Sequence, residues 1–264
     1  MGGIGLWSAG RRRKNGSMAK LEAVVSYAQR YLKVAEIEDY PGAHNGLQVE
    51  NSGNVKRVLA SVDAGLPVIK KAAAAGPGSL LVLHHGLFWS GVQPVTGIFR
   101  EKLEIMRKAD MALYAVHLPL DAHAVVGNNV LLAKALGLRG LKNFLGFGRT
   151  GTFTGSRTDL VRRLMKTTGR VPEVCAAGPA RPRRVGVITG GAGDMVEKAA
   201  AAGIDTFVTG EGPQWSWVRA EELGINVIYG GHYATETLGV QALAAHLAKK
   251  FRVPWKFIDH PVPL

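Results

Sequence analysis

An internal repeat constrains the fold of this chain more than any other feature. Residues 71–76 have the sequence KAAAAG, and residues 198–203 repeat it. Each copy precedes a short apolar run, residues 80–83 in the first half and 206–209 in the second. Alternating helix and strand patterns are typical of α/β folds with largely parallel strands. We therefore expect two similar α/β lobes, produced by an internal repeat, with a cleft between them.

Composition supports a compact protein of this kind. Of the 264 residues, 47% are hydrophobic and 20% are charged, which excludes an intrinsically disordered chain. The single cysteine, Cys175, rules out a disulfide within the chain and favours a reducing cytoplasm. No window approaches 18 uninterrupted apolar residues, so no membrane span is predicted. We expect a disordered extension or expression remnant at 1–17, a first lobe at 18–140 and a second lobe at 141–264.

The chain is strongly basic. Its formal net charge is +13, and removing the four basic residues Arg11–Lys14 still leaves +9. Such an excess attracts anionic partners, among them nucleotides, phosphates and nucleic acid, without choosing between them. Few aromatic residues lie among the basic ones, so no stacking platform for single-stranded nucleic acid is predicted. We expect an anionic small-molecule substrate, with nucleic acid as an alternative partner.

Two adjacent histidines follow the first repeated strand. His84 and His85 come directly after the apolar run, and the carboxyl ends of strands are where sites form in α/β sheets. Neighbouring residues of a regular strand point to opposite faces, so one centre can use both only if the backbone turns. Gly86 permits such a turn. A histidine pair by itself is weak evidence for a metal site.

A histidine stands four residues before a carboxylate in each half. The pairs are His117 with Asp121 and His232 with Glu236, each just after a strand-like run. Residues four apart on a helix share a face, so imidazole and carboxylate can reach one ion. The simpler alternative for the second pair is a surface histidine and a glutamate that favours the helix dipole.

Together these residues form a set with metal-binding chemistry. Three histidines and two carboxylates are the ligand mix expected for two nearby divalent ions such as zinc, manganese or iron. The members of the set are His84, His85, Asp121, His232 and Glu236. A pair of such ions lowers the pKa of bound water and holds an oxyanion, which is the chemistry of hydrolysis.

Three further features are open to more than one interpretation. His117 is a further ligand, a proton-transfer group or a packed structural residue. Glu211 either faces the cleft and acts on substrate or bound water, or caps the helix that begins near Pro213. The glycine-rich loop at residues 190–193 is either a seat for phosphate or a structural turn, and it lacks the P-loop residues.

These motifs resemble the GTP cyclohydrolase 1 type 2 homologues, also called Nif-three-like proteins. The matching segments span about residues 42–261 and include residues 45–49, 61–63, 84–86, 114–121, 190–193, 209–211, 231–236 and 257–261. The resemblance implies a two-lobed Nif-three-like fold, a toroidal homohexamer and a dinuclear metal site made by the same five residues. It is also the ground for considering ring-opening hydrolysis of a nucleotide.

Two functions of different classes follow. The first is a dinuclear divalent-metal-dependent hydrolase, cyclohydrolase-like, that acts on a nucleotide or a related phosphate-bearing small molecule, with His117 and Glu211 as candidate catalytic residues. The second is a ring-shaped metal-binding protein with a regulatory or nucleic-acid-associated role and no turnover. Turnover by the metal-loaded protein separates the two.

Overall fold

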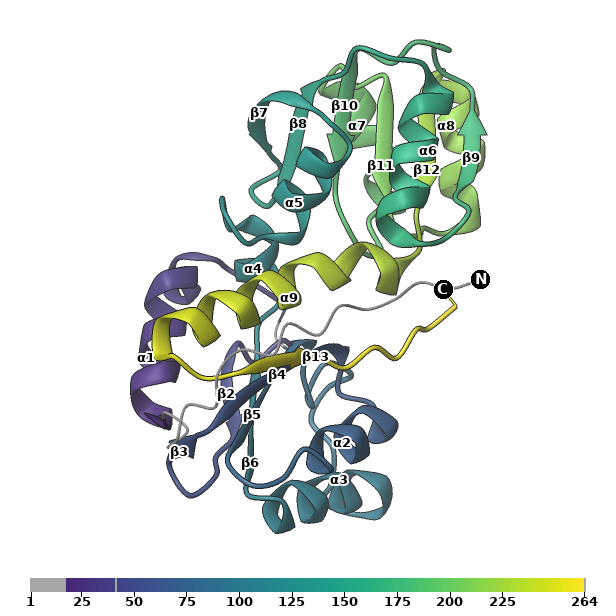
Figure 1. Ribbon diagram of the computed structural model, residues 1–264. Helices are drawn as coiled ribbons and strands as arrows, with labels where there is room; N and C mark the ends of the chain where they lie inside the picture. Colours follow the sequence, from purple (N-terminus) through teal and green to yellow (C-terminus); the bar gives the residue numbers. More distant parts are fainter. Residues whose placement is uncertain (1–17, 41, 264) are drawn as a thin grey trace, which may run out of the picture.

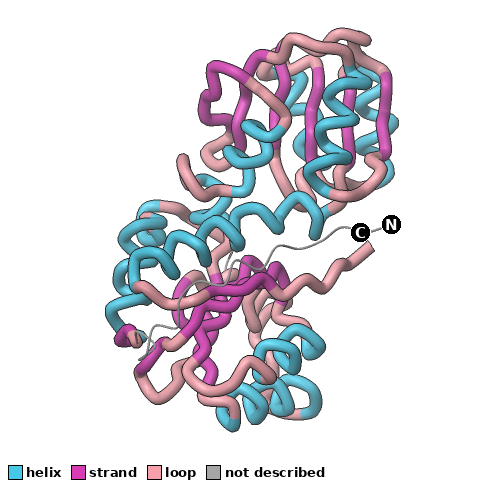
Figure 2. The backbone as a smooth tube through the Cα atoms, viewed as in Figure 1, coloured by secondary structure: helices cyan, strands magenta, loops and turns pink. Residues whose placement is uncertain are grey.

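The computed structural model describes residues 18–40 and 42–263, which form two α/β lobes joined by a long helix (Figure 1). The predicted extension at 1–17 lies outside these residues. Each lobe has a central sheet with helices on both faces (Figure 2). This arrangement confirms the α/β fold expected from the alternating pattern.

The first lobe contains a five-stranded sheet in the order β13-β4-β5-β6-β2. Its strands are β2 (Gly46–Val49), β4 (Arg57–Asp63), β5 (Ser79–His85), β6 (Met111–Ala115) and β13 (Trp255–Phe257). Neighbours are parallel except β2, which pairs antiparallel with β6. All seven residues of β5 are buried, as expected for a strand covered on both faces. A short ribbon of β1 (Ala19–Lys20) and β3 (Asn54–Val55) lies beside this sheet.

Two pairs of helices cover this first sheet. The helices α2 (Leu66–Ala73) and α3 (Gly97–Lys108) pack on one face, where Ile69 and Met106 meet Leu81 and Leu83. The helices α1 (Leu21–Leu32) and α9 (His232–Phe251) pack on the other, against alternate residues of the same strands. Burying both faces excludes water from the sheet and leaves the strand ends as its accessible edge.

The second lobe contains a six-stranded sheet in the order β7-β8-β10-β11-β12-β9. Its strands are β7 (Arg139–Phe144), β8 (Gly148–Thr152), β9 (Glu173–Ala176), β10 (Arg184–Val187), β11 (Thr206–Thr209) and β12 (Asn226–Tyr229). The central three are parallel and the outer ones antiparallel. One face carries α5 (Asn128–Ala135) and α6 (Arg157–Thr168), and the other α7 (Val196–Ala201) and α8 (Gln214–Leu223).

The two copies of KAAAAG occupy corresponding places in the lobes. The first spans the end of α2 before β5, and the second spans the end of α7 before β11. Their last residues, Gly76 and Gly203, have φ angles of +89° and +71°, the left-handed conformation that ends a helix and favours glycine. The segments β4–β6 and β10–β12 therefore share one order of elements: strand, helix, strand, helix, strand.

The C-terminal part of the chain returns to the first lobe. Helix α9 begins at the end of β12, then buries Val240, Leu243 and Leu247 against the first sheet, and β13 pairs with β4 (Figure 1). With 20 residues the helix spans about 30 Å, enough to reach from one lobe to the other. The sequence-based division had assigned all of residues 141–264 to the second lobe. An apolar helical stripe shows that a helix packs on a sheet, but not on which of two sheets.

No helix in the described part of the chain has the length and apolar character needed to cross a membrane.

Candidate metal centre

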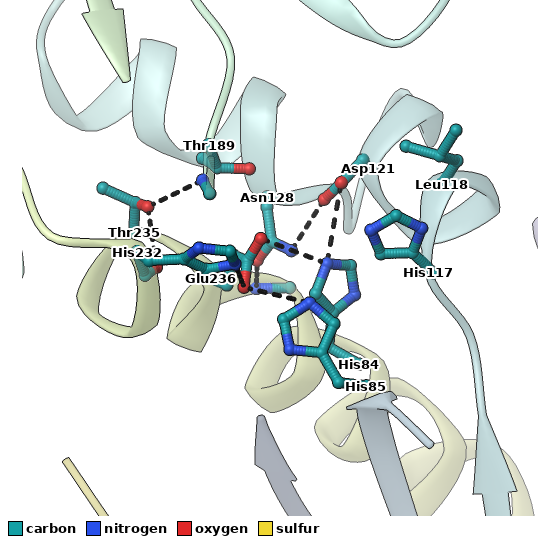
Figure 3. Close-up of polar contacts among 12 residues, drawn as sticks. His84, His85, His117, Leu118, Asp121, Asn128, Thr189, His232, Thr235 and Glu236 are labelled. Atoms are coloured by element: carbon teal, nitrogen blue, oxygen red, sulfur yellow. Dashed lines mark hydrogen bonds and ion pairs between the residues drawn. The ribbon is translucent and has the colours of Figure 1, made fainter. Parts of the chain in front are cut away.

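A cluster of histidine and carboxylate side chains lies where the strand ends of the first lobe meet the start of α9 (Figure 3). Within residues 18–40 and 42–263, three groups have ligand atoms within 4.8 Å of one another: His84, His85 and His117; His85, His232 and Glu236; and His84, Asp121 and Glu236. All five predicted ligands belong to these groups, together with His117. They come from β5, from the short helix α4 (Leu118–Ala122) and its preceding residue, and from α9.

His84 and His85 are the last two residues of β5, and no turn separates them. The strand ends just before Gly86, the residue that permits a turn, and turn residues follow at 87–90. The two histidine rings still converge, with centroids 4.8 Å apart, because both reach beyond the end of the strand toward one carboxylate. His84 Nε2 lies 3.5 Å from Glu236 Oε1, and His85 Nε2 lies 3.5 Å from Glu236 Oε2.

Glu236 is the only carboxylate that belongs to two of these groups of described residues. It stands one turn after His232 on α9, and His232 Nε2 approaches its Oε2 to 3.2 Å, as the four-residue spacing predicted. Its side chain is 3% exposed, so the carboxylate is shielded from water by the surrounding imidazoles. The burial of Glu236 beside His232 does not favour the alternative of a surface histidine with a glutamate that serves only the helix dipole.

Asp121 joins the cluster from α4, on the side opposite His85. Its Oδ2 lies 3.6 Å from His84 Nε2. The other oxygen, Oδ1, accepts a 2.8 Å hydrogen bond from the buried amide of Asn128, whose own Oδ1 accepts from the backbone N–H of Gly239 on α9. Asn128 thus ties the carboxylate of Asp121 to the helix that carries Glu236.

The Nδ1 atom of each histidine in the cluster is held by an oxygen. Nδ1–H of His85 donates to Asp63, that of His117 to Asp39 and that of His232 to Glu211, each at 2.8 Å. Nδ1–H of His84 donates to the carbonyl of Val116 at 3.0 Å. Donation from Nδ1 leaves Nε2 as the free ring nitrogen when the imidazole is neutral, which is how metal-binding histidines are oriented.

His117 and Glu211, the candidate catalytic residues, have different settings. His117 is buried beside His84, with ring centroids 4.9 Å apart, and it lines the cavity described below. Glu211 instead contacts His232 and does not cap α8, whose first turn receives no side-chain hydrogen bond. Glu211 therefore contacts the predicted ligand His232 at Nδ1, the ring nitrogen that does not approach Glu236.

Opposing influences set the protonation of the cluster. Burial alone lowers the pKa of His84, but the charges of Asp121 and Glu236 outweigh it and hold that pKa well above the usual value. Burial likewise opposes the charged form of His232, yet Glu236 and Glu211 raise its pKa to about 9. Burial would raise the pKa of Glu236, but the nearby histidines lower it strongly. The cluster without an ion therefore holds protons at neutral pH.

Three buried atoms of the cluster fit a divalent cation. Within the described residues, Nε2 of His84, Nε2 of His85 and Oε2 of Glu236 are inaccessible to solvent and have no hydrogen-bond partner. Buried polar atoms are normally satisfied, and groups left without partners point to an ion or water. Imidazole nitrogen and carboxylate oxygen suit zinc, manganese or iron, so the residues present fit a divalent metal.

Metal affinity is expected to rise with pH. Below a pKa of about 9, His232 carries a proton that a metal must displace, and His84 does the same. Raising the pH removes this competition, so the dissociation constant for zinc or manganese should fall at least about tenfold per pH unit between pH 6 and 8. Chelator competition at fixed ionic strength measures it. A metal affinity that does not change over that pH range would contradict the conclusion that His84 and His232 are protonated in the metal-free protein.

Three of the four backbone N–H groups of the glycine-rich loop at residues 190–193 bond within the protein, which favours a structural turn. Backbone N–H groups of Gly190, Ala192 and Gly193 donate to Thr235, Thr209 and the carbonyl of Glu211, at 2.9–3.2 Å. These donors point into the protein and are not available to a phosphate.

A cavity of about 400 Å³ opens beside the cluster, between the two lobes. Its wall includes Asp121, His232 and Glu236 as well as His117. A volume of this size lies within the range of small-molecule sites. The side chains that could hold a metal therefore line the same cavity that has room for a small molecule.

Comparison with known proteins decides the family. The family profile of Duf34/NIF3 (NGG1p interacting factor 3) matches residues 19–263. The chain belongs to the Duf34/NIF3 family. The resemblance seen in the sequence motifs is thereby confirmed.

Relatives of this Duf34/NIF3 protein match it over nearly their whole length. A GTP cyclohydrolase 1 type 2 homolog of Pseudomonas aeruginosa is 40% identical over 253 residues, covering 92% of this chain and 98% of the relative. One from Deinococcus radiodurans is 38% identical over 250 residues, covering 92% and 94%. A crystal structure of a Thermus thermophilus protein has a TM-score of 0.88 and 38% identity, covering 93% of this chain and all of the other.

Several residues that hold the cluster were not predicted. Asp39 lies 78 positions before His117, so no local spacing connects them. Burial alone would raise the pKa of Asp39, but hydrogen bonds from His117, Asn45 and Leu118 lower it. Asn128 had a detectable signal, since two adjacent asparagines begin an otherwise apolar helical stretch. Buried amides of this kind usually satisfy a particular partner.

Proposed function

We propose that this protein is a metal-dependent hydrolase of the GTP cyclohydrolase 1 type 2 kind, acting on a nucleotide or a related phosphate-bearing small molecule. His84, His85, Asp121, His232 and Glu236 would hold two divalent ions. The observation that carries the proposal is the convergence of buried, unpartnered imidazole and carboxylate atoms at the wall of a ligand-sized cavity. The names of the relatives supply the reaction class.

The bound ions would supply a nucleophilic water at neutral pH and stabilise negative charge on the substrate. The chain's own residues orient the site. His85 and His232 are fixed by Asp63 and Glu211, so their Nε2 atoms face the cluster without rotating. Asn128 fixes the carboxylate of Asp121 in the same way.

His117 is the best-placed residue to accept a proton. Its Nδ1–H donates to Asp39, so Nε2 is the basic atom and lies at the cavity wall. Burial lowers the pKa of His117, against the opposing influence of Asp39. The imidazole is therefore neutral at pH 7 and able to take a proton from a group in the cavity.

A turnover assay tests the proposal. Protein stripped with a chelator is reloaded with manganese, zinc or iron and incubated with GTP and other nucleotides, and products are separated chromatographically. We expect conversion by the loaded protein, none by the stripped protein, and a loss of about 100-fold or more in His117→Gln with metal content unchanged.

The alternative function, a metal-binding regulatory or nucleic-acid-associated protein, predicts no turnover. Loaded protein that converts no nucleotide, yet binds DNA with a steep dependence on salt, would favour a regulatory or nucleic-acid-associated role. Metal content measured on the same samples shows whether a negative result reflects an empty site.

A further inference from the structure

Aromatic surface is exposed on the first-lobe side of the cavity. Trp89 stacks on His85, with centroids 4.7 Å apart and planes 23° apart, and its ring also lies 4.3 Å from that of His117. Tyr40 meets Trp89 edge-on at 6.0 Å. Both line the cavity, yet Trp89 remains 37% exposed and Tyr40 57% exposed. A flat apolar surface is thus open to solvent directly beside the cluster.

The second lobe completes the cavity with further apolar groups. Phe147, Ile188 and Met195 lie on its wall, and they belong to the segments around β8 and β10 and to the turn before α7. The cavity therefore has aromatic or aliphatic walls from both lobes, with the histidine and carboxylate cluster alongside. Planar aromatic ligands bind between such walls by stacking and by displacing water.

The charges around the cavity do not favour phosphate. Among the described residues that line it, none is lysine or arginine. Of the lining residues that the structure describes, the one charged residue outside the cluster is Asp194, an exposed carboxylate with no phosphate-binding capacity. Three of the four backbone N–H groups of the nearby glycine-rich loop, those of Gly190, Ala192 and Gly193, are used within the protein. A carboxylate accepts N–H donors, such as those on the edge of a purine.

We propose that this cavity binds the base of the substrate, a planar heterocycle with N–H donors stacked on Trp89, and not its phosphate. The inference rests on the proposed function, which it refines by assigning base recognition to Trp89 and the cavity walls. The chain's excess positive charge then acts at a distance on the anionic substrate, because it supplies no cation to the cavity wall.

Binding to the full-length protein without metal tests this directly, because it removes the ions as a handle for phosphate. Guanosine serves as the probe with a base and no phosphate, and ribose 5-phosphate as the probe with phosphate and no base. We expect saturable guanosine binding in equilibrium dialysis, unaffected by an equal concentration of ribose 5-phosphate.

Two substitutions separate stacking from packing. Trp89→Leu keeps an apolar side chain over His85 but loses the flat ring, and should weaken guanosine binding about tenfold. Trp89→Phe keeps a ring and should stay within about threefold of the parent. Trp215→Ala removes a tryptophan that is 49% exposed on α8, away from the cavity, and should change nothing. Circular dichroism and metal uptake establish that each variant is folded.

Several results would overturn the inference: no saturable guanosine binding to the parent, equal binding to Trp89→Leu and the parent, or displacement of guanosine by ribose 5-phosphate. Failure of the hydrolase proposal is distinguishable from these. Guanosine binding through Trp89 without turnover by the metal-loaded protein would refute hydrolysis alone. Nucleotide turnover that Trp89→Leu leaves unchanged would refute base stacking alone.

Discussion

Replacing Glu236 by glutamine is expected to abolish metal retention. Its two oxygens lie 3.5 Å from His84, 3.5 Å from His85 and 3.2 Å from His232, so one carboxylate faces three imidazoles. Glutamine has the same shape but carries no charge and presents an amide nitrogen that cannot ligate a cation. We expect the affinity for zinc or manganese to fall by about 100-fold or more, beyond the effect of losing an outer-shell partner.

Metal per chain, measured by mass spectrometry of dialysed protein, reads out this loss. Glu222→Gln is the matched control, because Glu222 is an exposed glutamate on α8 whose partner is Arg219 at 2.8 Å. Exposed ion pairs contribute little, so the control should keep the parent's metal content and stability. Equal metal content in Glu236→Gln and the parent would refute the assignment of this carboxylate as a ligand.

Replacing Gly190 by alanine should disrupt the same site from the other lobe. Gly190 has a φ angle of +72°, and a Cβ there would clash with the carboxylate of Glu236 and come within 3.3 Å of His232 Nε2. The left-handed conformation itself costs a non-glycine residue about 1–3 kcal/mol. Since Glu236 is buried and surrounded by imidazoles, it can move away only by leaving its place in the cluster. We expect a lower free energy of unfolding and a metal affinity reduced at least about tenfold.

Gly169 provides the control for backbone strain. Its φ angle is +71°, but a Cβ there would have no atom within 4 Å. Gly169→Ala should therefore lower the free energy of unfolding by about 1–3 kcal/mol without changing metal affinity. Chemical denaturation and chelator competition on the two variants separate strain from displacement. The clash with Glu236 is refuted if Gly190→Ala binds metal as tightly as Gly169→Ala does.

The base-stacking inference and the ligand assignment address different parts of one site. Glu236 and Gly190 concern the cluster, whereas Trp89 concerns the cavity wall that covers His85. Trp89→Leu is expected to keep its metal, and Glu236→Gln is expected to keep its guanosine binding in metal-free protein. Loss of metal from Trp89→Leu, together with loss of guanosine binding by Glu236→Gln, would show that the cluster and the cavity wall do not act independently.

The local sequence was sufficient to predict the types of side chain in the candidate metal site and much of the secondary structure. The apolar run at residues 80–83 lies within β5, because a continuous apolar run is a local property of the sequence. The four-residue spacing of His232 and Glu236 placed both on one helical face, and the structure has them 3.2 Å apart. The strands β2 and β9, both at sheet edges, were not predicted, because their sequences carry little apolar alternation.

Contacts between distant segments were beyond sequence reasoning. Asp39 orients His117 across 78 positions, and Asn128 links Asp121 to the backbone of Gly239 across 111. The role of Trp89 was not predictable, because an aromatic residue in a loop has no spacing that indicates which ring it will cover. The return of β13 to the first sheet could not be predicted either, since its pairing with β4 joins segments about 200 residues apart.

By itself the sequence determined that this is an α/β chain of the Duf34/NIF3 family, with histidines and carboxylates at the ends of strands and on one face of a helix. Only the tertiary structure decided that these side chains converge, that carboxylates hold three of the histidines, and that an aromatic wall without cations lies beside them. The physical reason is that periodicity is a property of neighbouring residues. Convergence depends on how helix α9 crosses from one lobe to the other and packs on a sheet formed far away in the sequence.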